Sequence, residues 1–153
     1  MEYVVVSAKD FNEARRKIRE NKLKEKKEIV FTSNDDELNR KVLEKEAIDT
    51  LLISQKGRKD KLKQRDSGFN QVLAKIAKKK NIIIGINLDE ILSPGSLEEK
   101  AEILARIQQN VVLCNKNKLK MKFISTEAKA RSKHDLKALG LVLGMPTWMN
   151  KEI

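Results

Sequence analysis

The sequence predicts an α/β fold in which short strands alternate with helices. Five short apolar runs, several rich in β-branched residues, are separated by segments with the 3.6-residue periodicity of amphipathic helices. The strongest run, Ile82–Leu88, is continuously apolar apart from Gly85 and Asn87, as expected of a parallel strand buried on both faces. Such alternation gives βαβ units with parallel strands and right-handed crossovers. A complete eight-stranded barrel needs about 250 residues, so five units fit either a contracted or incomplete barrel or an open sheet.

The first half of the chain is predicted to contain three strands, at Tyr3–Val6, Ile29–Thr32 and Thr50–Ser54. Two helices separate these strands, and each begins at a capping pair with a glutamate three residues after the cap. The first pair is Asp10 with Glu13 and the second is Asn34 with Glu37. Their expected apolar faces are Phe11, Ala14 and Ile18 in the first helix, and Leu38, Val42 and Ala47 in the second.

The second half continues the alternation. A helix follows the third strand, with Phe69, Val72, Leu73, Ile76 and Ala77 at the spacing of one buried face. After the strand Ile82–Leu88, the capping box of Ser96 and Glu99 begins a long helix with Leu97, Lys100, Leu104, Ile107, Val111 and Cys114 along one side. Met121–Ser125 is the fifth strand, and a last helix over Leu136–Leu143 ends before Gly144 and Pro146.

Length and composition favour a single cytoplasmic domain spanning residues 1–153. The chain is 40% hydrophobic, which is adequate for one core. No apolar run reaches the roughly 18–20 residues that cross a bilayer, and the N-terminus lacks the basic region of a signal peptide. The single cysteine, Cys114, has no internal disulfide partner. We therefore expect a cytoplasmic location and no membrane partner.

The net charge of +11 is segregated along the chain. Residues 54–80 carry 10 basic and 2 acidic residues, and residues 116–153 carry 9 and 3. Residues 1–53 are balanced at 12 and 12, and residues 81–115 carry 2 basic and 5 acidic residues. Segregated basic blocks indicate nucleic acid or an acidic membrane surface as the partner. Nucleic acid is favoured, because no basic amphipathic helix of the membrane type is present.

Two basic loops, residues 54–67 and 126–133, each follow a strand and precede a helix. They should therefore lie at the C-terminal edge of the sheet, where α/β folds bind ligands and helix N-termini favour phosphate. The expected phosphate contacts in the first loop are Arg58, Lys59, Lys61, Lys63 and Arg65. Asp66 or Ser67 is expected to cap the next helix, and Gly68 to allow close backbone approach. Ser67 and Asn70 either contact RNA or only organise the turn. The runs Lys78–Lys80 and Lys116–Lys122 fall at the opposite edge, where they either complement helix dipoles or contact RNA.

Catalytic chemistry has little support in the sequence. The chain has one histidine, His134, and Ser132, His134 and Asp135 are crowded into one turn. Asp89 and Glu90 follow the best strand, but two carboxylates without imidazole partners are more often a solvated or capping pair than a metal site. We assign no catalytic residue and no metal ligand. The aromatic residues fall mainly on apolar faces, which favours structured RNA over single strands as the partner.

Three segments together resemble ribonuclease P protein component 3, the archaeal homologue of the thirty-kilodalton eukaryotic ribonuclease P subunit. They are RDSGFNQVLAKIAKKKNIIIGINLDEIL (Arg65–Leu92), Lys100–Met121 and RSKHDLKALGLVLGM (Arg131–Met145). The similarity covers roughly residues 56–146, and the order and spacing of three blocks make it specific. Residues 1–53 fit only by their secondary-structure pattern. The family usually has Arg-Ser-Pro-Arg-Asp-Leu in the third block, whereas this chain has Lys133 and His134 in place of the proline and second arginine.

The resemblance implies a TIM-barrel-like α/β fold related to the polymerase and histidinol phosphatase superfamily. It also implies a non-catalytic subunit that acts with ribonuclease P protein component 2 and other subunits. The catalytic RNA trims the 5′ leader of precursor tRNA, with Mg²⁺ expected to accompany the RNA and no cofactor bound by this chain. In the third block Arg131, Lys133 and His134 become RNA-contact candidates, with Asp135 capping the helix or orienting Arg131. The alternatives are a small metal-dependent phosphoesterase of the related superfamily and an RNA-binding scaffold of another ribonucleoprotein.

Overall fold

Five parallel strands form one open sheet in the computed structural model of the chain, which describes residues 2–24, 27–126 and 131–153. The strands are β1 (Tyr3–Ser7), β2 (Glu28–Thr32), β3 (Thr50–Leu52), β4 (Ile83–Asn87) and β5 (Met121–Ile124). They lie in the order β1-β2-β3-β4-β5, and every neighbouring pair is parallel. The predicted α/β fold with parallel strands is confirmed, and the sheet is open rather than closed.

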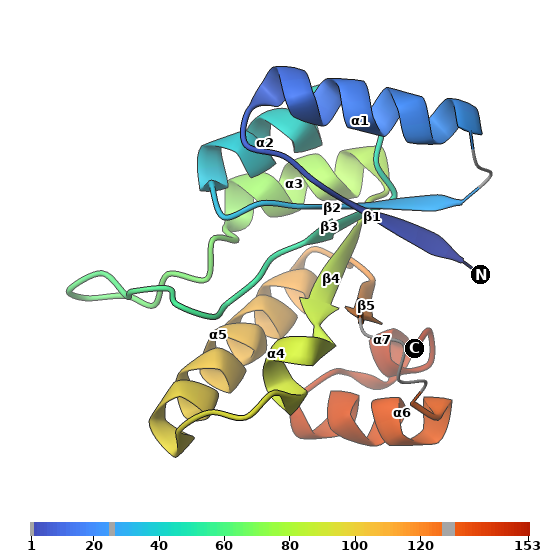
Figure 1. Cartoon of the computed structure of the whole chain (residues 1–153). Helices are drawn as coiled ribbons and strands as arrows, with labels where there is room; N and C mark the ends of the chain where they lie inside the picture. Colours follow the sequence, from blue (N-terminus) through green and yellow to red (C-terminus); the bar gives the residue numbers. More distant parts are fainter. Residues whose placement is uncertain (1, 25–26, 127–130) are drawn as a thin grey trace.

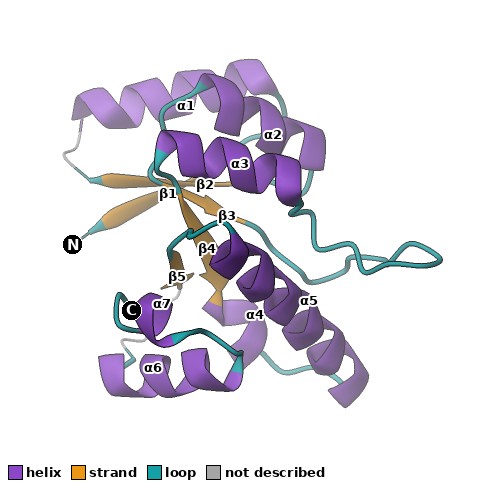
Figure 2. Cartoon of the chain, turned by 180° about the vertical axis from the view of Figure 1, so that it is seen from behind, coloured by secondary structure: helices purple, strands orange, loops and turns teal. Residues whose placement is uncertain are grey.

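The helices follow the strands along the chain (Figure 1). They are α1 (Phe11–Lys24), α2 (Asp36–Lys45), α3 (Gln71–Lys80), α4 (Leu88–Leu92), α5 (Leu97–Lys116), α6 (Lys133–Val142) and α7 (Thr147–Asn150). Helices α1, α2 and α3 lie together over β1–β3, and α4 to α7 lie near β4 and β5 (Figure 2). None of the helices within the described part of the chain is long and apolar enough to span a membrane.

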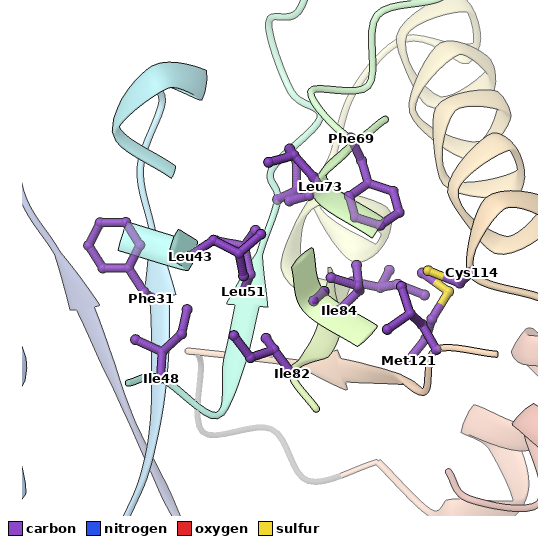
Figure 3. Packing of buried hydrophobic residues seen from close by; sticks show 14 of the residues in the cluster. Phe31, Leu43, Ile48, Leu51, Phe69, Leu73, Ile82, Ile84, Cys114 and Met121 are labelled. Carbon is purple, nitrogen blue, oxygen red and sulfur yellow. The ribbon is translucent and has the colours of Figure 1, made fainter. Parts of the chain in front are cut away.

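The buried hydrophobic residues of α1, α2, α3 and α5 pack against one face of the sheet. A single apolar cluster joins strand residues such as Phe31, Leu51 and Ile84 to helix residues such as Leu43 and Leu73 (Figure 3). A second, small cluster on the other face consists of the strand residues Val30, Leu52 and Ile124, with Tyr3 and Val5 packed against it. Sequential parallel strands with right-handed crossovers place their helices on one side in this way.

The sheet is strongly curled toward the face without helices. Tyr3 in β1 donates a hydrogen bond from its hydroxyl to the Ser125 carbonyl (2.7 Å) and accepts one from the Ser125 amide (3.1 Å), just after β5. Lys122 in β5 pairs with Glu28 in β2 at 3.2 Å. In a flat sheet β1 and β5 would lie about 19 Å apart, which is beyond the reach of one tyrosine side chain. The strands therefore form an arc, and Tyr3 bridges its two ends.

Several predicted helix boundaries are corrected by the observed caps. Asp35, not Asn34, caps α2, and Ala47 lies beyond the end of that helix. Asn70, not Asp66 or Ser67, caps α3, so Phe69 is buried just before the helix. Ser132, not Asp135, caps α6. In each case the side chain of the observed cap accepts a hydrogen bond from a free backbone N–H in the first turn of the helix.

The structure also adds two short helices and exposes two residues that were expected to be buried. Helix α4 begins directly where β4 ends, so the apolar run from Ile82 contains a strand and the first residue of a helix. Helix α7 follows Pro146. Val72 is half-exposed and Leu97 is 89% exposed, because the buried faces of α3 and α5 begin with Leu73 and Ile103.

Candidate nucleic-acid interface

The basic loop between β3 and α3 forms an arm that extends away from the body of the protein (Figures 1 and 2). We call residues 56–65 the cationic arm; they contain six basic residues and one acidic residue, Asp60. The tip is a tight turn, in which the backbone groups of Lys61 and Gln64 exchange hydrogen bonds of 3.0 and 3.2 Å. Leu62 is fully exposed at this turn. Lys59, Lys61, Lys63 and Arg65 are all exposed, as a phosphate-contacting surface requires.

Buried polar side chains from distant elements hold the base of the arm. The Glu90 carboxylate of α4 accepts hydrogen bonds from the backbone N–H groups of Gln55 (2.8 Å) and Lys56 (3.1 Å). The Gln55 side chain donates to the Ser67 carbonyl at 2.9 Å, which joins the segment entering the arm to the segment leaving it. The Ser67 hydroxyl donates to Asn110 of α5 at 2.6 Å. These contacts fix both ends of the arm against the body.

Arg106 on α5 is 3% exposed and contacts the arm from the interior of the protein. Its guanidinium donates to the Asp60 carboxylate at 3.1 Å and to the Arg58 carbonyl at 2.9 Å. Asp60 also accepts from the Asp66 backbone N–H at 3.0 Å. The Asp66 N–H and, to a smaller degree, the Arg106 guanidinium lower the pKa of the Asp60 carboxyl from its ordinary value.

Arg58 differs from the other predicted phosphate contacts. Its guanidinium forms a two-pronged ion pair with Asp36 of α2 at 2.8 and 3.1 Å, and its Nε donates to the Ser54 carbonyl at 2.8 Å. The guanidinium also packs over Gly68, which has a φ of +75° and no room for a Cβ atom. Arg58 therefore braces the arm against α2, and the close approach expected at Gly68 is made by Arg58.

Ser67 and Asn70 take part in organising the turn. Ser67 is 1% exposed, and its hydroxyl faces Asn110 in the interior. Asn70 is exposed and accepts from the Leu73 N–H at 3.0 Å as the cap of α3. A cavity of about 500 Å³ lies between the arm and this end of the helix. Its lining residues include Lys61, Arg65, Asn70, Gln71 and Gln109. This cavity lies beside the N-terminus of α3 and is lined by both polar and apolar side chains.

The second basic turn lies partly outside the described residues, because 127–130 are not among them. Arg131, Lys133 and His134 are exposed around the start of α6. In Figure 1 the arm extends to the left, whereas the start of α6, beside the grey segment, lies on the right. Both loops follow the C-terminal ends of strands, but the start of α6 lies on the other side of the protein from the arm in this view.

Asp89 and Glu90, the paired carboxylates after β4, organise loops. Asp89 accepts from the Ser125 hydroxyl at 2.6 Å and from the Thr126 N–H and hydroxyl at 2.9 and 2.8 Å. Glu90 holds the base of the arm, as described above. Over residues 2–24, 27–126 and 131–153, no group of three or more histidine, cysteine, aspartate or glutamate side chains is arranged to hold a metal ion.

Several lysines at the opposite edge of the sheet have partners within the chain. Lys80 donates to the carbonyls of Leu43 (2.6 Å), Glu44 (3.2 Å) and Glu46 (2.9 Å) at the end of α2. Lys78 donates to the Lys118 carbonyl at 3.0 Å. These contacts favour complementation of helix C-termini over RNA contact for Lys78 and Lys80.

Sequence reasoning located the cations of the arm but missed the buried residues that hold it, chiefly Arg106, Glu90 and Asn110. They lie 34 to 51 residues from their partners in the arm and at its base, so no local pattern joins them. One signal was present: Arg106 and Asn110 share the helical face of Ile103 and Ile107, where a polar residue must be buried. A polar residue on an apolar stripe needs a partner, and here that partner is the arm.

Comparison with known proteins supports the fold. A scan against protein-family models and a search of curated proteins found no match. Among solved structures, a chain of the cryo-EM structure of archaeal ribonuclease P with mature tRNA is similar, with a TM-score of 0.76 and 24% sequence identity. The match covers 97% of this chain but 62% of that chain. This chain therefore shares its fold with most of a chain in an archaeal ribonuclease P structure.

Proposed function

We propose that this chain is a non-catalytic protein subunit of ribonuclease P, of the component 3 type. The observation that carries the proposal is the structural match to a chain of archaeal ribonuclease P, which extends over nearly the whole of this chain. The resemblance of Arg65–Leu92 and Arg131–Met145 to component 3 supports the same assignment. The curled sheet of sequential parallel strands also suits an incomplete barrel of the TIM type, as that resemblance implies.

The surface chemistry suits RNA as the partner. The cationic arm presents exposed lysines and an arginine beyond a fixed base, which suits contact with phosphates and carries no base readout. Within the arm we assign phosphate contact to Lys59, Lys61, Lys63 and Arg65. Arg58 and Ser67 support the arm, since their polar groups bind within the chain. Asn70, Arg131, Lys133 and His134 remain candidates for further RNA contact.

The partners then follow from the proposed assembly. They are the catalytic RNA, precursor tRNA, component 2 and other ribonuclease P proteins, with Mg²⁺ supporting the chemistry of the RNA. In this arrangement the protein neutralises phosphates and stabilises the folded RNA, and the RNA cleaves the leader. The phosphoesterase alternative gains no support from Asp89 and Glu90, because both carboxylates already accept hydrogen bonds from neighbouring loops.

Reconstitution tests the proposal. Cleavage of a precursor tRNA transcript by the catalytic RNA should be measured with component 2, with and without this chain, at limiting Mg²⁺. We expect the chain to increase cleavage by the assembled mixture and to show no cleavage without the RNA. Cleavage by the protein alone would support the phosphoesterase instead. RNA binding without any effect on the assembled mixture would support a scaffold of another ribonucleoprotein.

A further inference from the structure

Arg106 contacts the cationic arm without forming part of its exposed surface. Its guanidinium is buried on α5 and contacts three groups of the preceding loop: the Asp60 carboxylate, the Arg58 carbonyl and, at 3.5 Å, the Gln55 carbonyl. Arginine suits this place because its rigid fork can donate to several acceptors at once while it remains charged. A buried charge of this kind is retained only where its donors are satisfied.

Asp60 also joins the segment that enters the arm to the segment that leaves it, which we call its two limbs. Its carboxylate accepts from Arg106 on α5 and from the Asp66 N–H on the returning limb. Asp60 is also the one acidic residue among residues 56–65, so it lowers the positive charge of the arm. Electrostatics alone would disfavour an acidic residue in a surface that binds a polyanion. Its contacts instead indicate a role in shape.

The tip of the arm lies beyond these contacts. Lys61 and Gln64 close a turn on themselves, and Gln109 of α5 donates to the Arg65 carbonyl at 3.4 Å. The cations at the tip are therefore presented from a base that is fixed on both limbs. A fixed surface binds a partner of matching phosphate spacing without having to be ordered first. A flexible polyanion adapts its own shape and gains little from a fixed arm.

We propose that Arg106, acting through Asp60, is a positioning residue that fixes the cationic arm so that it selects folded RNA over flexible polyanions. This inference rests on the proposed RNA-binding function and adds the class of RNA and the residues that set the selectivity. It places the determinant of selectivity in two residues that act through the conformation of the arm rather than through contact with a base.

The substitution Asp60→Ala separates shape from charge. It removes the acceptor of Arg106 and of the Asp66 N–H, and it makes the arm more positive. If charge alone decided binding, affinity for every polyanion would rise. We expect instead roughly tenfold weaker binding to a folded precursor tRNA transcript, because the arm must be ordered on binding. Binding to heparin should stay the same or tighten. Glu20→Ala on α1, an exposed site with the same change of charge, is the matched control and should not weaken either interaction.

Two further measurements address folding and rescue. Hydrogen exchange of Asp60→Ala should show faster exchange over residues 56–66, with the sheet and α5 protected as in the wild type. Asp60→Glu retains a carboxylate for Arg106 and should restore part of the preference for folded RNA. Unchanged exchange of the arm would overturn the inference, even if the affinity for RNA fell.

The outcomes separate this inference from the proposed function. Wild-type protein that binds neither probe would refute the RNA-binding function. Wild-type protein that binds folded RNA, with an Asp60→Ala variant that binds it equally well or more tightly, would overturn the positioning role alone. Equal weakening toward precursor tRNA and heparin would also overturn it, because selectivity would then not depend on the shape of the arm.

Discussion

The basic residues of this chain have different roles, depending on whether their side chains face solvent or other groups of the protein. Lys61 and Lys63 extend into solvent at the tip of the arm, whereas Arg58 braces the arm against Asp36 and Arg106 holds it from the interior. The sequence predicted the charge of the arm but not this division. The sequence around Arg58 does not show whether its side chain is exposed or paired, because its partner Asp36 lies more than 20 residues away.

The titration of Asp60 tests the described contacts at the level of one residue. The Asp66 N–H and the Arg106 guanidinium both favour its charged form, so its pKa in the folded protein should lie below the ordinary value of 3.8. The stabilising contribution of its ionised form is then present above pH 3.8 and is lost as the pH falls through the lowered pKa. Carbon-13 NMR of the Asp60 carboxyl should give this low midpoint, and a midpoint at or above 3.8 would contradict the described contacts.

At the scale of elements, apolar stripes were largely predictable, because they depend on neighbours within four residues, whereas the caps of α2, α3 and α6 differ from those predicted. All five strands and the five longer helices were predicted close to their observed positions. The short helices α4 and α7 were missed because one turn is too brief to show a period. The exposure of Val72 could not be read from the sequence either, since it depends on where α3 lies against its neighbours.

The N-cap of α3 gives a test at this scale. Asn70 accepts from the Leu73 N–H, and alanine cannot, so Asn70→Ala should lower the free energy of unfolding by about 1 kcal/mol. Urea denaturation followed by circular dichroism measures the change. Lys79→Ala, at an exposed site near the end of the same helix, is the control and should change stability by less than about 0.5 kcal/mol. Equal effects of the two substitutions would argue against Asn70 as the cap.

The whole molecule is an arc of βα units whose ends are bridged by side chains. Parallel pairing of the strands followed from their alternation with helices, but the curl did not. It depends on contacts between β1 and the end of β5, which are 122 residues apart in the sequence. Lys122 contributes to the same bridge, since it pairs with Glu28 and lies 5.3 Å from the centre of the Tyr3 ring.

The bridge by Tyr3 predicts a loss of stability when its hydroxyl is removed. Tyr3→Phe removes the hydroxyl that forms hydrogen bonds with the backbone carbonyl and N–H of Ser125. The substitution should lower the free energy of unfolding by about 1–2 kcal/mol. Thermal and urea unfolding provide the measurement. The exposed Ser7→Ala in the same strand should have a smaller effect. If Tyr3→Phe is as stable as the wild type, the arc does not depend on this bridge.

Contact between the cationic arm and RNA phosphates is central to the proposed function. The most direct test is the salt dependence of binding to the catalytic RNA, measured for a Lys59→Gln, Lys61→Gln, Lys63→Gln variant. The matched control removes three exposed lysines from the opposite edge, as Lys24→Gln, Lys79→Gln and Lys116→Gln. Each phosphate contact contributes roughly 0.7–0.9 to the slope of log K against log salt, so loss of the arm lysines should flatten it by about two to three. The control should retain the wild-type slope, and an equal slope in both variants would contradict phosphate binding by the arm.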